Sequence, residues 1–226
     1  MSSPGVESFG YLASVLSVIQ FVPQVRRTLR TRITAGISAP FWGVAGAQAS
    51  MWIVYGVGRG LVPSVLTNIV LTVCTVLMLG VLVREGAPQA RGSAVFAAIT
   101  WLVVSGVTLA AGYQPAGVGA TFVSFVIMWP QTWTAMRSRS IEGLAPVAWM
   151  IGVAATASWF CYGIGRGDIR IWLTAGESCL LSIVVLARVL HVRRMHARGE
   201  HGPAAAGLAG AVRSNEDTGP VAVVCS

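Results

Sequence analysis

Long apolar stretches without a formal charge dominate the chain. Residues 33–58 and 60–83 contain no Asp, Glu, Lys or Arg, and neither does the 45-residue stretch 92–136. A helix needs about 20 apolar residues to cross the hydrocarbon core of a bilayer, so the longest stretch holds two crossings, with a turn predicted at 112–117. The pattern predicts seven transmembrane helices, over residues 7–26, 36–56, 61–83, 93–111, 115–135, 144–164 and 169–190.

Both the length and the periodicity of these stretches favour helices over strands. A strand of a membrane barrel alternates apolar with polar positions over about ten residues, whereas these stretches are longer and do not alternate. The predicted fold class is therefore an all-α membrane protein. The first ten residues lack the basic cluster of a cleavable leader, so we expect the first helix to stay in the mature protein.

One sequence pattern occurs twice, and its two copies lie 107 residues apart without a gap. The dipeptide Pro23-Gln24 recurs as Pro130-Gln131. The other identities are mostly glycine and aromatic residues: Gly36 with Gly143, Trp42 with Trp149, Trp52 with Trp159, Tyr55 with Tyr162, and Arg59 with Arg166. Such a repeat fixes the architecture, because it shows that one three-helix unit is used twice in the same order.

The basic residues assign a side to each loop. All sixteen are arginine, and only Arg59, Arg166 and Arg170 lie in the loops after the second and sixth predicted helices. By the positive-inside rule the N-terminus lies outside and the C-terminus in the cytoplasm of a multi-pass plasma-membrane protein. Eleven of the arginines follow the odd-numbered predicted helices: Arg26, Arg27, Arg30, Arg32, Arg84, Arg91, Arg137, Arg139, Arg193, Arg194 and Arg198.

The charge bias also sets the relative orientation of the two copies. It puts both Pro-Gln motifs on the cytoplasmic side, so the copies are parallel, and a parallel second copy needs one extra crossing. Residues 93–111 supply that crossing, which gives a layout of three, one and three helices. The predicted domains are a first bundle, a linker helix, a second bundle and a disordered cytoplasmic tail, over residues 1–86, 87–113, 114–195 and 196–226.

Composition excludes several classes of protein. The hydrophobic share of 54% is too high for a soluble domain. A retinal pigment is excluded because it needs a lysine for its Schiff base, and the chain contains none. The net charge of +8 is divided among loops, so it does not indicate nucleic-acid binding. The cysteines have unrelated spacings and the histidines follow the last helix, so we expect neither a metal nor a cofactor.

The repeated motif resembles a known family. The run from Pro23 to Trp42, followed by Trp52-Ile-Val-Tyr55-Gly56, is similar to the PQ-loop family and, within it, to the SWEET and SemiSWEET sugar transporters. The resemblance covers about residues 8–190. It implies a non-enzymatic carrier in the lipid bilayer, with a small-molecule substrate in a central path, and it is compatible with a homo-oligomeric assembly.

Depth along the helices suggests which side chains share a site. Trp52 and Asn68 lie six and seven residues from the outer ends of their helices, so both are about 9–10 Å deep. An indole covers an apolar sugar face, and an amide both donates to and accepts from hydroxyls. The second copy has Trp159 and Ala175 at the matching positions, so this predicted site contains one amide instead of two. Packing stays open as an alternative for the tryptophan and asparagine side chains.

The Pro-Gln motifs predict a hinge at the inner gate. Pro23 and Pro130, followed by Gln24 and Gln131, each remove a backbone hydrogen bond within a helix, although a static kink would look the same in sequence. The opposite ends of the helices carry polar side chains that are candidates for an outer gate: Tyr55, Arg59, Tyr162, Arg166 and Asp168. We assign Trp42 and Trp149, nearer the cytoplasmic face, to the interfacial belt or to packing.

Glu177 is the one acid well inside a predicted span. It lies about 200° around the helix from Ala175, so it does not replace the missing amide. An acid at this depth is a candidate for proton coupling. The leading hypothesis is facilitative uniport of a mono- or disaccharide by alternating access. A proton-coupled amino-acid or metabolite carrier that uses Glu177 and a sorting receptor like the KDEL receptor are the alternatives.

Overall fold

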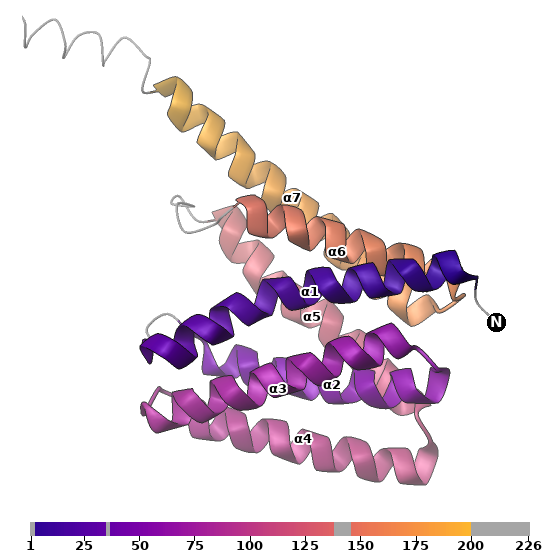
Figure 1. Cartoon of the computed structure of the whole chain (residues 1–226). Coiled ribbons are helices and arrows are strands. Elements are labelled where there is room, and N and C mark those ends of the chain that lie inside the picture. The colour runs from indigo at the N-terminus through magenta and orange to yellow at the C-terminus, as the bar shows by residue number, and fades with distance from the viewer. Residues whose placement is uncertain (1–2, 35–36, 138–145, 200–226) are drawn as a thin grey trace, which may run out of the picture.

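The computed structural model describes residues 3–34, 37–137 and 146–199, and these ranges contain seven α-helices (Figure 1). Each coincides with one predicted span, which confirms the all-α class. Five are long and apolar enough to cross a bilayer: α1, α3, α4, α6 and α7. The bounds are α1 Pro4–Thr31, α2 Ala39–Arg59, α3 Val62–Arg84, α4 Ala90–Ala111, α5 Gln114–Arg137, α6 Pro146–Gly165 and α7 Ile169–Gly199.

Two boundaries differ from the sequence prediction. Only Gly112 and Tyr113 separate α4 from α5, so the predicted turn at 112–117 is too long. Gly112 ends α4 with a φ of 74°, which a glycine adopts without strain, and the chain reverses directly after it. At the other end of the protein, α7 continues past residue 190 to Gly199. The first residues of the predicted tail are thus helical, and 200–226 lie outside the described residues.

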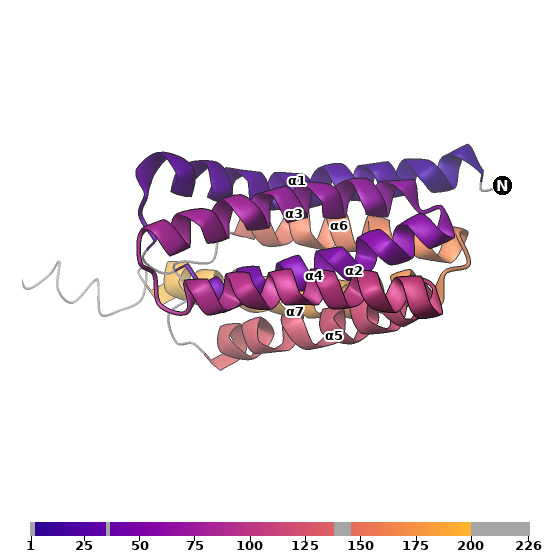
Figure 2. The same ribbon diagram turned by 90° about the horizontal axis from the view of Figure 1, so that it is seen from below.

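Six helices form a closed ring around the axis of the protein. In the first copy α3 packs between α1 and α2, and in the second copy α7 packs between α5 and α6. The ring closes because α1 packs against α6 and α2 packs against α5. α4 lies outside the ring, mainly on α2 and also on α3 and α5, at the lower margin in Figure 1 and in front in Figure 2. The layout of three, one and three helices is therefore confirmed.

The first copy packs through small residues and one large aromatic side chain. A Cβ atom added to Gly43 would lie 3.0 Å from the backbone oxygen of Ser93, so the glycine lets α2 and α4 approach closely. Trp42 is 1% exposed and packs in a core with Met78 and Leu82. Trp42 is thus a packing residue and not part of an interfacial belt. Trp149 packs beside the buried valines of α7.

Candidate functional site

Two indole side chains form a symmetric pair of hydrogen bonds between the two copies of the repeat. On α2, Trp52 Nε1 donates to Ser124 Oγ of α5 at 3.3 Å. On α6, Trp159 Nε1 donates to Ser17 Oγ of α1 at 3.2 Å. The two serines are themselves 107 residues apart, and each donates to a carbonyl one turn earlier in its own helix, both at 2.8 Å. Both indole N–H groups are therefore directed to the other copy of the repeat.

One turn further along α2 and α6, two tyrosine rings pack against the same helices of the other copy. A Cβ atom at Gly117 of α5 would lie 2.5 Å from the Tyr55 ring, and one at Gly10 of α1 would lie 2.9 Å from the Tyr162 ring. Each ring therefore occupies space that only a glycine leaves free. The glycine seven residues before the serine in both copies is the sequence signal for this docking, and sequence reasoning missed it.

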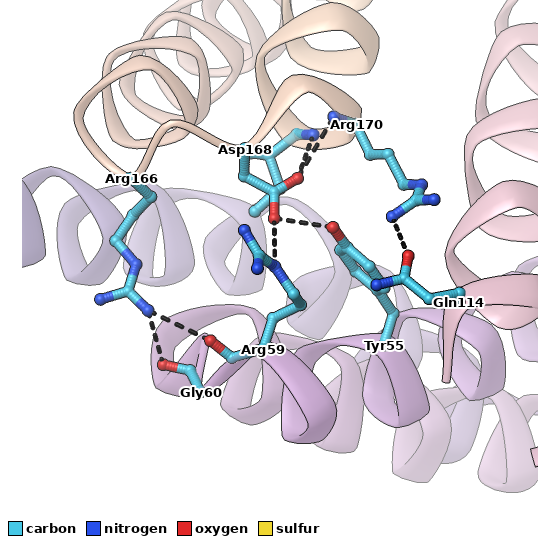
Figure 3. Close-up of polar contacts among 8 residues, drawn as sticks. Tyr55, Arg59, Gly60, Gln114, Arg166, Asp168 and Arg170 are labelled. Atoms are coloured by element: carbon cyan, nitrogen blue, oxygen red, sulfur yellow. Dashed lines mark hydrogen bonds and ion pairs between the residues drawn. The ribbon is translucent and has the colours of Figure 1, made fainter. Parts of the chain in front are cut away.

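Asp168 joins the two copies at the end of the bundle where α2 ends and α7 begins (Figure 3). Its Oδ2 atom accepts from Tyr55 Oη at 2.7 Å and from Arg59 Nε at 3.2 Å. Its Oδ1 atom accepts from the backbone N–H groups of Arg170 and Ile171 at 3.2 and 3.4 Å, which caps α7. The side chain is buried, so these donors supply the stabilisation that water would give a free carboxylate.

The surrounding side chains reinforce this contact. The hydrogen bond that Arg59 donates to Asp168 raises the pKa of Arg59 above its ordinary value, so the guanidinium stays charged. Arg170 lies with its guanidinium carbon 4.9 Å from the centre of the Tyr55 ring, and its Nη1 donates to Gln114 Oε1 at 2.7 Å. We call Tyr55, Arg59, Asp168 and Arg170 the latch, and this end of the bundle the latch end.

Arg166 makes a second connection at the latch end. Its Nη1 forms an ion pair with Glu7 Oε1 at 3.1 Å. Its Nη2 donates to the backbone oxygens of Arg59 and Gly60 at 3.3 and 3.1 Å (Figure 3). The structure thus brings together four of the five residues predicted to form an outer gate.

The fifth residue, Tyr162, is present at this end but lies outside the polar network. It is fully buried, and its hydroxyl has no hydrogen-bond partner within the described residues. Its ring packs in an apolar cluster that contains Leu61. Leu61 occupies the position in the first copy that Asp168 occupies in the second. The latch is therefore one-sided.

The remaining predicted binding residues lie on α3 and α7. Asn68 is half-buried, and its Nδ2 donates to Ser64 O of its own helix at 2.8 Å. Ala175 is buried. Glu177 is half-buried: its Oε2 accepts from Ser178 Oγ at 3.3 Å, and its Oε1 has no partner among the described residues.

Gln48 belongs to the same interface, although sequence reasoning passed over it. Its Nε2 donates to Ser124 Oγ at 2.6 Å, so this serine accepts from both Gln48 and Trp52. The available signal was a polar side chain in an uncharged run, one helical turn before Trp52. The repeat-equivalent residue of the second copy is Ala155.

The Pro-Gln motifs lie within helices at the opposite half of the bundle. Pro23 and Gln24 are exposed and α1 continues through them to Thr31. Pro130 and Gln131 belong to α5, and their side chains lie outside the described part of the structure. The predicted hinge stays a prediction.

Comparison with known proteins gives consistent matches. Residues 5–65 match the model of a family described as PQ loop repeat. A curated protein named Sugar transporter SemiSWEET, from Leptospira biflexa serovar Patoc, is 32% identical over 77 residues, which are 34% of this chain and 91% of the relative. A protein of the same name from Escherichia coli (strain UMEA 3162-1) is 30% identical over 78 residues, 34% of this chain and 88% of the relative.

A solved structure matches over most of the chain. The structure of a eukaryotic SWEET transporter is similar with a TM-score of 0.73 and covers 82% of this chain and 95% of its own. The sequence identity of 15% means that this similarity concerns the fold. The short relatives match one repeat unit, whereas the solved structure matches the arrangement of both.

Proposed function

Because the chain belongs to the PQ-loop family, in the branch of the SWEET and SemiSWEET proteins, we propose that it carries a small polar solute across a membrane, with a mono- or disaccharide as the substrate. The relatives are named as sugar transporters, and the function is accordingly not enzymatic. The observation that carries the proposal is the symmetric pair of Trp–Ser hydrogen bonds between the copies.

The paired indoles suit a sugar ring. Trp52 and Trp159 come from opposite copies, so a solute between the copies meets an indole on each side. A pyranose has apolar C–H faces that pack on indoles, and its hydroxyls need groups that both donate and accept. Asn68 supplies such a group in the first copy, and Ala175 leaves the matching position of the second copy without one. These four residues form the proposed binding site.

Alternating access follows from a closed latch end and a hinge in the other half. The latch and Arg166 hold the two copies together at one end. Pro23 and Pro130 weaken α1 and α5 in the opposite half, because proline removes a backbone hydrogen bond. The bundles 1–86 and 114–195 then rock about the linker 87–113. The arginine bias puts the latch end outside the cell, with the Pro-Gln motifs towards the cytoplasm.

Glu177 supports a second candidate function, a proton-coupled carrier. Its carboxylate lies inside α7, and one oxygen is buried without a partner in the described part of the chain. A carboxylate inside a membrane helix is a candidate proton site, and a proton that enters and leaves it would couple transport to a pH gradient. Uniport needs no such step.

Uptake by the purified full chain in liposomes tests the proposal. We expect uptake of sugars and not of amino acids, independent of a pH gradient. Asn68→Ala should weaken sugar affinity about tenfold, because solute hydroxyls lose a buried partner. Ala175→Asn should be tolerated. Absence of sugar uptake in correctly inserted protein would disprove the proposal. Solute accumulation that is driven by a pH gradient and abolished by Glu177→Gln would establish the proton-coupled carrier instead.

A further inference from the structure

One face of α1 changes from apolar to basic towards the end of the bundle opposite the latch. Val15, Ile19 and Val22 are 56%, 47% and 39% exposed, and Arg26 and Arg30 further along the helix are exposed as well. At about 100° per residue, these five side chains lie within about 80° of one another around the helix axis. They form one continuous stripe, which we call the α1 stripe, and its last two members are guanidinium groups.

The apolar part of the α1 stripe faces the bilayer. α1 is long and apolar enough to span a membrane, and it packs against α3 and α6. It lies at the upper margin of the bundle in Figure 2. Exposed valine and isoleucine side chains on such a helix contact acyl chains, which are as apolar as they are. The stripe therefore runs from the hydrocarbon core towards the membrane surface.

The second copy of the repeat indicates the depth at which the stripe becomes basic. The residue of α5 that is equivalent to Arg26 is Trp133, which is 56% exposed and lies one turn after the equally exposed Trp129. Exposed tryptophans on membrane helices lie at the level of the lipid headgroups. Because the copies are parallel, Arg26 lies at this level on α1, and Arg30 lies about 6 Å further out.

The two guanidinium groups of the stripe have no protein partner within the described residues. Both ion pairs of that part of the chain lie at the latch end, and the one acid of α1, Glu7, belongs to one of them. A guanidinium presents a planar set of N–H groups that matches two oxygens of a phosphate. Arg26 and Arg30 therefore form a surface that is complementary to an anion at headgroup depth.

We propose that the α1 stripe binds an anionic phospholipid, with the phosphate on Arg26 and Arg30 and an acyl chain along the apolar part of the stripe. The apolar and basic parts lie in the order and at the depths that a phospholipid requires. An arginine beside an anionic membrane surface contributes about fivefold in affinity. The site belongs to the first copy alone, because α5 has Trp133 where α1 has Arg26.

Native mass spectrometry of the full chain in an uncharged detergent tests the proposal. The probes are phosphatidylglycerol, phosphatidylcholine with the same acyl chains, and glycerol 3-phosphate, which lacks acyl chains. We expect phosphatidylglycerol to bind about twentyfold more tightly than phosphatidylcholine, because the two arginines select its net charge. Glycerol 3-phosphate should bind about a hundredfold more weakly, since it makes no contact with the apolar part of the stripe. Equal affinities for the two lipids, or for phosphatidylglycerol and glycerol 3-phosphate, would overturn the proposal.

Two double variants with the same change in charge locate the site. Arg26→Gln with Arg30→Gln should bring the affinity for phosphatidylglycerol to within about threefold of that for phosphatidylcholine. Arg27→Gln with Arg32→Gln is the control, because both arginines are exposed in the same segment but lie off the stripe; most of the preference should remain. No loss in the first variant, or equal losses in both, would show general attraction to a basic end and would overturn the site.

Discussion

Tyr55 and Tyr162 are equivalent in the repeat but differ in their partners. Both are buried, and each ring lies on a glycine of the other copy's first helix. Both rings belong to the apolar cluster that contains Leu61. Tyr55 donates to Asp168, whereas the hydroxyl of Tyr162 has no partner in the described ranges. The comparison shows that the repeat determines where the tyrosines lie. Asp168 stands where the first copy has Leu61, and this single difference determines that Tyr55, and not Tyr162, forms a side-chain hydrogen bond.

The two copies also differ in their side-chain hydrogen bonds deeper in the bundle. Ser124 accepts hydrogen bonds from Trp52 and Gln48, whereas Ser17 accepts only from Trp159 among the described donors. At the depth of the two serines, α2 therefore donates two side-chain hydrogen bonds to α5, whereas α6 donates one to the equivalent serine of α1. We expect the two interfaces to respond unequally to matched substitutions.

Removing the charge of Asp168 should have the largest effect. Asp168→Asn weakens the acceptor of Tyr55 and the cap of α7, and should lower the free energy of unfolding by about 2–3 kcal/mol. Arg59 adds little to this loss, because its side chain is 40% exposed. Thermal unfolding in detergent measures the change. The control is Glu7→Gln, which removes a more exposed acid at the same end and should cost less than about 1 kcal/mol; equal losses would show that Asp168 has no special role.

A second latch should slow transport. Leu61→Asp places a carboxylate at the position equivalent to Asp168, where the buried hydroxyl of Tyr162 lacks a partner among the described residues. We expect the closed latch end to be stabilised and the initial rate of uptake to fall about tenfold, the effect of one added hydrogen bond to a charged group. Leu61→Ala is the control, since it removes the leucine without adding an acceptor. Uptake that is equally fast in both variants would contradict the symmetric geometry.

The serine pair should show a smaller, graded difference. Ser124→Ala leaves two donors without their acceptor and Ser17→Ala leaves one. The first variant should therefore be less stable than the second by about 1 kcal/mol. Chemical unfolding of the two variants side by side measures this difference, and a larger loss in Ser17→Ala would reverse the assignment of the stronger interface.

The prolines should give the smallest effect on binding. Pro23→Ala and Pro130→Ala restore a backbone hydrogen bond in α1 and α5 away from the proposed binding site. We expect turnover to fall several-fold while affinity changes by less than about threefold, because the hinge affects motion and not recognition. Turnover that is unchanged in both variants would identify static kinks.

Much of the fold could be predicted from the sequence because membrane helices leave a strong local signal. Uncharged runs of sufficient length located all seven helices, and the arginine pattern with the 107-residue repeat required parallel copies and a linking helix. The boundaries were less certain. The turn after Ala111 is shorter than predicted and α7 is longer, since helix ends depend on local capping and on which residues leave the bilayer.

The sequence also predicted both indoles of the proposed site, and three of the four latch residues, Tyr55, Arg59 and Asp168, were among the predicted outer-gate residues, whereas Arg170 was not. It did not identify their partners. Gln48, Ser17 and Ser124 carry no motif, and their roles appear only when α2 meets α5 and α6 meets α1. Likewise, Tyr162 was grouped with the outer-gate residues, but its hydroxyl lies apart from their polar contacts.

The sequence by itself determined the number and order of the helices, because apolar length acts on each segment separately in the bilayer. Only the tertiary structure decided that each tyrosine lies on a glycine of the opposite copy, that Asp168 reaches Tyr55 and not Tyr162, and that Gln48 and Trp52 share Ser124 as their acceptor. The physical reason is that these contacts join residues more than sixty positions apart. Hydrogen bonds at that separation depend on how the helices pack around the ring, which the local sequence of either partner does not encode.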